Sequence, residues 1–174
     1  FWKIKKKCYI KGMSSKIEKV SDFILEAHQR GSTFYNLEKD MKPEDFDEAY
    51  KIQHRLRQKL PRGPLGGYKI ALSSKIQQDY HKISQPVYGG LFKNEIFSSP
   101  KTLALNNYHR MSVEFELAFE LSDRILDPTI QRNSANIFQD ISNVMPAIEL
   151  VDDRGANYEA VSYTHLTLPT IYSV

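Results

Sequence analysis

Apolar and polar residues alternate with a period of two along residues 113–119. Such alternation is typical of a β-strand that rests one face on a core. It places Glu114 and Glu116 side by side on one face and apolar side chains on the other. A second strand is expected over residues 145–154, where Glu149 interrupts an apolar run. The pattern therefore predicts two strands that together carry three carboxylates.

Helical spacing of apolar residues dominates the first third of the chain instead. A capping box formed by Ser15 and Glu18 predicts the start of a helix, and Gly31 predicts its end. A second helix is predicted from Pro43 to Leu60, before a turn-rich segment. The predicted inward-facing residues are Ile17, Val20, Phe23, Ile24 and Ala27 in the first helix and Phe46, Ala49, Tyr50, Leu56 and Leu60 in the second.

Shorter elements are predicted between the helices and the acidic strands. In chain order they are a strand at 68–72, a helix from Ser73 or Ser74 to Tyr80, a glycine-containing loop at 85–92, a strand at 95–97, and a helix at 134–143 with Ala135, Phe138 and Ile141 inward. Helices that precede a mixed, β-rich region predict an α+β fold.

The three carboxylates suggest a metal site. Two like charges this close on a strand repel each other unless a cation offsets them. Mg²⁺, or Mn²⁺, bound by oxygens of Glu114, Glu116 and Glu149 would do so, since hard cations prefer oxygen ligands. Alternatively, Glu114 and Glu116 belong to the solvated face of a half-exposed sheet. Glu149 needs a partner in either case, because it lies in an apolar run.

Three blocks of sequence, taken in order, resemble one enzyme family. They are residues 67–75 with 85–89, residues 113–118 and residues 146–154. Their order and spacing are similar to the 2-oxopent-4-enoate hydratase, 2-oxohept-3-enedioate hydratase and 4-oxalocrotonate decarboxylase branch of the fumarylacetoacetate hydrolase superfamily. The resemblance covers about residues 14–161 and corresponds to the N-terminal part of those enzymes, so a truncated fumarylacetoacetate-hydrolase-like domain is expected.

The resemblance implies a lyase of aromatic catabolism that needs a divalent metal. It would hydrate a 2-hydroxy-dienoate or 2-oxo-enoate, with Glu114, Glu116 and Glu149 as metal ligands and Lys69 as the catalytic residue. On sequence alone Lys69 is more readily interpreted as a solvated strand lysine, and it is the resemblance that reverses this interpretation. Ser74, at a predicted helix N-terminus, could bind the substrate carboxylate or could simply cap the helix.

Two alternatives to a hydratase stay open. Val87 occupies the position after a proline where many of these hydratases carry aspartate, whereas an apolar residue there is more common in 4-oxalocrotonate decarboxylases. A decarboxylase is therefore the first alternative. The second is a non-catalytic, truncated fragment. We expect the full-length parent to be an enzyme and a homo-oligomer, and the present segment to be inactive alone.

Composition argues against two other classes of protein, those that bind nucleic acid and those that span a membrane. The net charge of +3 depends on five lysines in residues 1–12; without them, acidic residues outnumber basic ones, which argues against nucleic-acid binding. No apolar run reaches the roughly 20 residues of a membrane span. Cys8 is the only cysteine, which favours a cytoplasmic setting. We interpret residues 1–12 as a non-native leader, 13–160 as the domain, and the uncharged residues 161–174 as a non-native, adapter-like tail.

Overall fold

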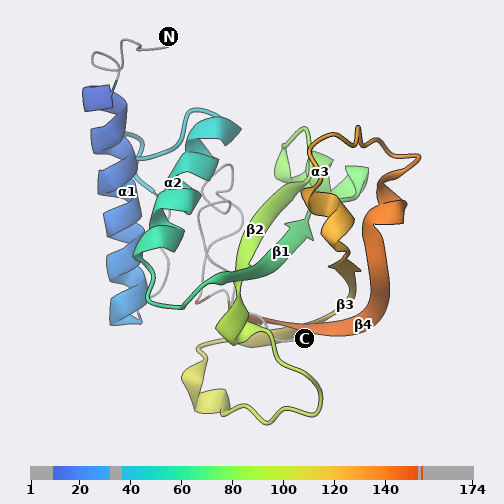
Figure 1. Ribbon diagram of the computed structural model, residues 1–174. Coiled ribbons are helices and arrows are strands. Elements are labelled where there is room, and N and C mark those ends of the chain that lie inside the picture. Colours follow the sequence, from blue (N-terminus) through green and yellow to red (C-terminus); the bar gives the residue numbers. More distant parts are fainter. Residues whose placement is uncertain (1–9, 32–36, 153, 155–174) are drawn as a thin grey trace.

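The computed structural model describes residues 10–31, 37–152 and 154. Most of the predicted leader and all of the predicted tail lie outside these residues, so the boundaries at residues 12 and 161 stay predictions. The described residues combine helices with two-stranded antiparallel sheets, which is an α+β arrangement as predicted (Figure 1). Among them, no helix is both long and apolar enough to cross a bilayer.

Two long helices, α1 (Ile10–Arg30) and α2 (Phe46–Lys59), lie side by side at one end of the molecule (Figure 1). α1 begins ahead of the predicted capping box, of which the Ser15 side chain lies outside the described residues. Gly31 follows its end with a φ of 62°, as a left-handed helix stop requires. α2 begins after Pro43 because the Asp45 carboxylate caps it, accepting the backbone N–H of Glu48 at 2.8 Å.

The main core lies between the two helices and the end of strand β2 (Val87–Phe92). Its buried members are Val20, Ile24, Leu37, Met41, Ile52, Leu56, Leu60 and Phe92. Several predicted inward residues are therefore confirmed, but Phe23 is exposed because it lies outside the stripe of α1 that packs against this core. Ile52, which is fully buried, was missed.

The first sheet pairs β1 (Leu65–Ala71) with β2 (Val87–Phe92) in antiparallel fashion. Helix α3 (Lys75–His81) lies between them in the chain. The predicted loop at 85–92 is thus wrong for its last six residues. Gly90 marks close packing instead: a Cβ on it would approach the side chains of Leu65 and Arg57 to within 3 Å.

Two further predictions are wrong. The expected strand at 95–97 is replaced by a 3₁₀ turn, η1 (Lys93–Glu95), followed by irregular chain. The expected helix at 134–143 shrinks to the 3₁₀ turn η4 (Ile137–Asp140), and Phe138 is exposed. Asparagine side chains that bond to nearby backbone compete with a helix there, and the Asp140 carboxylate is drawn inward by two arginines.

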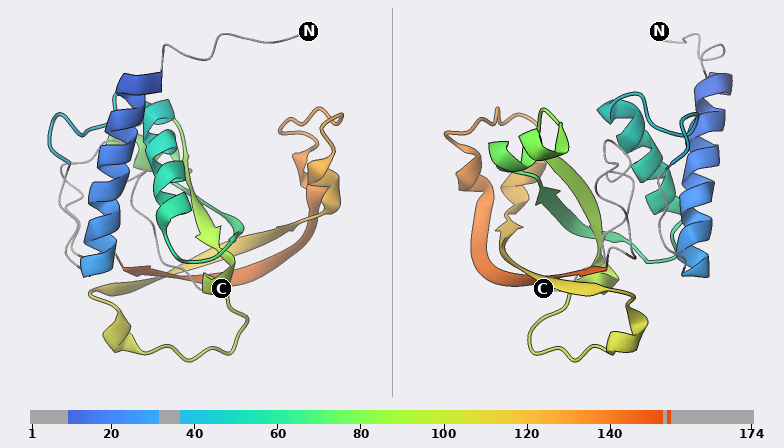
Figure 2. Two further views of the ribbon diagram at one scale, coloured as in Figure 1. Left: turned by 60° about the vertical axis from the view of Figure 1, so that its left-hand side comes forward. Right: turned by 180° about the vertical axis from the view of Figure 1, so that it is seen from behind.

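The second sheet is a long two-stranded ribbon of β3 (Met111–Leu121) and β4 (Ile141–Asp152). The turns η2 (Leu105–Asn107) and η3 (Asp123–Leu126) flank β3. Figure 2 shows the ribbon passing beneath the helices and curving upward at its far end. Both predicted acidic strands are confirmed. The apolar face of β3 is exposed in the described structure, with Phe115 at 87%, so this face does not rest on a core as the alternation predicted.

Candidate metal centre

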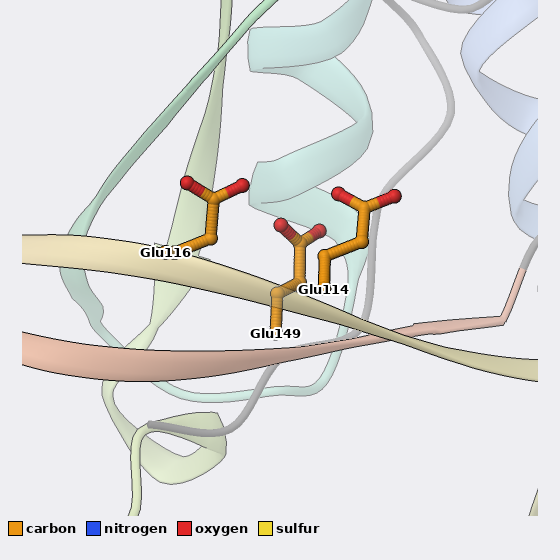
Figure 3. Close-up of side chains that lie close together, drawn as sticks. All are labelled: Glu114, Glu116 and Glu149. Atoms are coloured by element: carbon orange, nitrogen blue, oxygen red, sulfur yellow. The ribbon is translucent and has the colours of Figure 1, made fainter.

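The ribbon brings the three predicted glutamates together. Glu114 lies directly opposite Glu149 in the antiparallel ladder, and Glu116 follows two residues along on the same face. One carboxylate oxygen from each residue lies within 4.8 Å of the others. Figure 3 shows all three carboxylates pointing to the same side of the ribbon. The geometry is that of a cluster of oxygen ligands.

Glu149 is the buried member of this cluster. It is 4% exposed, whereas Glu114 and Glu116 are exposed. Its Oε1 atom is buried and has no hydrogen-bond partner among the described residues. An ionised carboxylate oxygen in that position is costly unless a positive group lies close to it. The donor set and this orphaned oxygen both fit a hard divalent cation.

Lys69 reaches the cluster from the other sheet. It lies on β1 opposite Gly89, and its Nζ forms an ion pair with Glu149 Oε2 and lies 3.5 Å from Glu114 Oε2. The Lys69 side chain is only 17% exposed, so it differs from a solvated strand lysine. Three carboxylates against one ammonium leave an excess of negative charge, which a divalent cation would neutralise. The catalytic role of Lys69 stays a prediction.

Ser74 is the N-cap of α3. Its Oγ accepts the backbone N–H of Gln77 at 3.3 Å, and the residue is exposed. The structure thus shows the capping alternative directly. A contact of Ser74 with a substrate carboxylate stays a prediction.

Val87 begins β2 and lies opposite Ala71, two residues along from Lys69. Paired residues of an antiparallel ladder share a face, so Val87 and Lys69 lie on the same side of this sheet. Val87 is half-buried and carries no group that could exchange a proton. The chemistry of this position therefore differs from that of an aspartate.

Sequence reasoning assigned no role to Asp152, which ends β4. Asp152 is buried, and its carboxylate accepts backbone N–H groups from the residues just before β3 and just after β4. The signal available was a carboxylate at the end of an apolar strand, which needs fixed donors when it is buried. That signal alone does not distinguish a structural carboxylate from a metal ligand.

Comparisons with known proteins agree with the predicted resemblance. The chain is 32% identical over 145 residues to the 2-keto-4-pentenoate hydratase of Paraburkholderia xenovorans, covering 81% of this chain and 52% of the relative. It is 31% identical over 116 residues to the 2-oxo-hept-4-ene-1,7-dioate hydratase of Escherichia coli, covering 66% and 43%. No family model matches the chain.

The fold is similar to that of 4-oxalocrotonate decarboxylase from Pseudomonas putida G7, solved with magnesium and adipate. The TM-score is 0.74 at 17% identity, over 88% of this chain and 59% of that one. A structure of the same enzyme with calcium and acetate gives a TM-score of 0.73 at 16% identity, over 92% and 61%. The predicted resemblance to this hydratase and decarboxylase branch is confirmed. The chain spans about half the length of the curated relatives it matches.

Proposed function

We propose that this chain carries the metal-binding and lysine part of a divalent-metal-dependent lyase acting on a short unsaturated 2-oxo acid. One observation carries the proposal: Glu114, Glu116 and Glu149 converge on one side of the ribbon, where Lys69 faces them and one buried Glu149 oxygen has no hydrogen-bond partner within the described part of the chain. The similarity to hydratases supports the same reading. Mg²⁺ is the proposed ion, and Mn²⁺ would suit the same ligands.

The residues have distinct parts in the reaction. Glu114, Glu116 and Glu149 would hold the cation, and the chemistry that such an ion supplies is stabilisation of negative charge developing at the substrate's 2-oxo oxygen. Lys69 Nζ is placed beside the same carboxylates, where it would balance negative charge or transfer a proton to or from the substrate carbon chain. Ser74 would bind a substrate carboxylate only if its capping hydroxyl reorients.

The reaction proposed first is hydration. A 2-hydroxy-dienoate is ketonised, and water then adds across the remaining double bond. Val87 favours a second candidate, decarboxylation of a 4-oxalocrotonate-type substrate. An aspartate at this position would offer a proton-exchanging carboxylate on the Lys69 face of the sheet, and valine does not.

Turnover is proposed for a protein that contains this segment together with the remainder that the relatives have. The 174 residues alone are expected to bind the metal without turnover, since about half of each relative lies outside the match. A cytoplasmic location and a homo-oligomeric parent belong to the same proposal.

A chimera tests this function. Residues 13–160 replace the matching part of the Paraburkholderia xenovorans hydratase, and the product is assayed with 2-hydroxypenta-2,4-dienoate and with 4-oxalocrotonate. We expect magnesium-dependent turnover of one of them that is lost in Glu116→Gln. Val87→Asp should shift the product toward hydration. A folded chimera that binds Mn²⁺ yet turns over neither substrate would overturn the proposal.

A further inference from the structure

The metal-ligand cluster depends on the register of the β3–β4 ribbon. Glu114 faces Glu149 because the ladder pairs Met111 with Asp152 and continues without a shift to Glu120. A slip of one residue would move one strand's carboxylates to the opposite face, since side chains alternate across a strand. Whatever fixes the Met111 end of the ladder therefore also fixes the glutamates.

Asp152 is the residue that ties this end together. It is 4% exposed, and its Oδ2 accepts the backbone N–H of His109 at 2.9 Å. Its Oδ1 accepts the backbone N–H groups of Arg110 and Arg154, both at 3.1 Å. One carboxylate thus joins the chain just before β3 to the chain just after β4. Burial alone would raise the pKa of Asp152, but these N–H donors hold it below its ordinary value, so the carboxylate is charged at neutral pH.

The same junction reaches the helices. Arg154 Nη2 donates to the backbone carbonyl of Ala27 at 2.7 Å, in the last turns of α1. The chain around Asp152 and Arg154 is therefore bound both to the ladder and to α1. These contacts hold the Met111–Asp152 end of the ribbon against the helices.

The far end of the ribbon carries a second buried aspartate. Asp140 is 1% exposed and is bound by Arg124 Nε at 2.9 Å and Arg132 Nε at 2.7 Å. A register shift between Glu120 and Leu121 separates it from the glutamates. Such a shift interrupts the regular pairing of the ladder between Asp140 and the glutamates. The two aspartates are alike in burial and charge but differ in their connection to the metal ligands.

We propose that Asp152 is a positioning residue that clamps the register of β3 against β4 and thereby sets Glu114 opposite Glu149. Within the described residues its carboxylate hydrogen-bonds to backbone N–H groups and not to the three glutamates, so it would act on the metal ligands only through the ladder. The expected effect on metal affinity rests on the proposed metal site. The expected effect on the register of β3 against β4 rests on the ladder alone.

The test compares Asp152→Asn with the matched control Asp140→Asn in the 174-residue chain. Each change keeps the side-chain shape and removes one buried charge, so both variants are expected to melt at a lower temperature. Mn²⁺ affinity should fall about tenfold in Asp152→Asn, as for other residues that orient metal ligands, and stay within about twofold in Asp140→Asn. Asp152→Glu keeps the charge but moves it, and its Mn²⁺ affinity should lie between those of Asp152→Asn and Asp140→Asn. It replaces Asp152→Asn in the comparison if that variant does not fold.

Amide hydrogen exchange reads the register without any metal. Protection at residues 113–116 should drop in Asp152→Asn, whereas Asp140→Asn should lose protection near residues 119–121. If the wild-type chain binds no Mn²⁺, the metal site fails while this exchange pattern still decides the clamp. Equal effects of the two substitutions on affinity and on exchange at residues 113–116, or no effect of Asp152→Asn, would overturn the inference.

Discussion

Lys69→Met removes the ammonium beside Glu149 and keeps a side chain of similar length. Glu149 is 4% exposed, so its charge becomes poorly compensated once Lys69 is gone. Breaking a buried ion pair by removing one partner typically costs 3–5 kcal/mol. Because the Lys69 side chain retains 17% exposure, we expect about 3 kcal/mol, at the lower end of that range.

A divalent cation should reverse most of this loss. Bound near Glu149, it supplies the positive charge that the variant lacks, and at about 100 times its dissociation constant it stabilises the folded state by about 2.7 kcal/mol. The variant should gain more from the ion than the wild type does, since the Lys69 ammonium no longer competes for the carboxylates, so its loss relative to the wild type should be smaller in Mg²⁺ than in EDTA. Urea unfolding followed by circular dichroism, with EDTA and with Mg²⁺, measures both the stability lost through the substitution and the stability gained from the ion.

Lys75→Met is the matched control for this experiment. Lys75 pairs with Asp79 at 2.7 Å on the surface of α3, and exposed pairs of this kind contribute less than about 1 kcal/mol. Its small loss should be the same with and without Mg²⁺. A Lys69→Met variant that loses under about 1 kcal/mol in EDTA, or loses equally in EDTA and Mg²⁺, would refute the reasoning.

Three further predictions concern residues outside the cluster. Burial, with Arg62 and Arg154 nearby, lowers the pKa of His28 to about 3. Because the unfolded chain binds this proton more readily, the free energy of unfolding should fall by about 1 kcal/mol per pH unit as the pH drops below about 6.5. In urea titrations, a His28→Gln variant should show a smaller decline between about pH 6.5 and 5. Lys82 is an exposed helix C-cap with a φ of 55°, so Lys82→Gly should raise the melting temperature by about 2 °C in a thermal scan, and a decrease would contradict the strain assigned to it. Because the apolar face of β3 is exposed, we expect the chain to self-associate through it. Phe115→Lys should then reduce association in sedimentation experiments without lowering the melting temperature, and an unchanged association state would contradict this expectation.

The long, strongly patterned elements were predictable from sequence. Alternation over residues 113–119 and the apolar run around Glu149 gave both strands of the ribbon, because a two-residue period has one interpretation over that length. The short elements were not predictable. The glycines of β2 indicate a loop locally, but in the fold Gly90 allows close packing against α2 and β1. The segment at 134–143 has helical spacing, yet it forms the 3₁₀ turn η4 and the start of β4, where Asp140 is bound by arginines 16 and 8 residues before it in the chain.

The candidate site was partly predictable for a related reason. Glu114 and Glu116 share a face by the geometry of any strand, but only the pairing of β3 with β4 places Glu149 opposite Glu114. The approach of Lys69 depends on how the two sheets meet, which no local pattern encodes. Lys69 was predicted as a site residue from the family resemblance, not from its position near the glutamates. The hydrogen bonds that Asp152 accepts within the described residues come from backbone N–H groups, which any residue type can offer, so nothing in the sequence pointed to its contacts.

The central claim is that Glu114, Glu116 and Glu149 hold one divalent cation. A titration of the 174-residue chain with Mn²⁺, followed by electron paramagnetic resonance, tests it most directly. We predict one site, weakened at least about tenfold by Glu→Gln substitution of each of the three. Glu120→Gln is the control, because Glu120 lies on the same face of β3 but opposite Asn143, and its affinity should match the wild type. Absence of binding, or equal weakening by Glu120→Gln, would contradict the account.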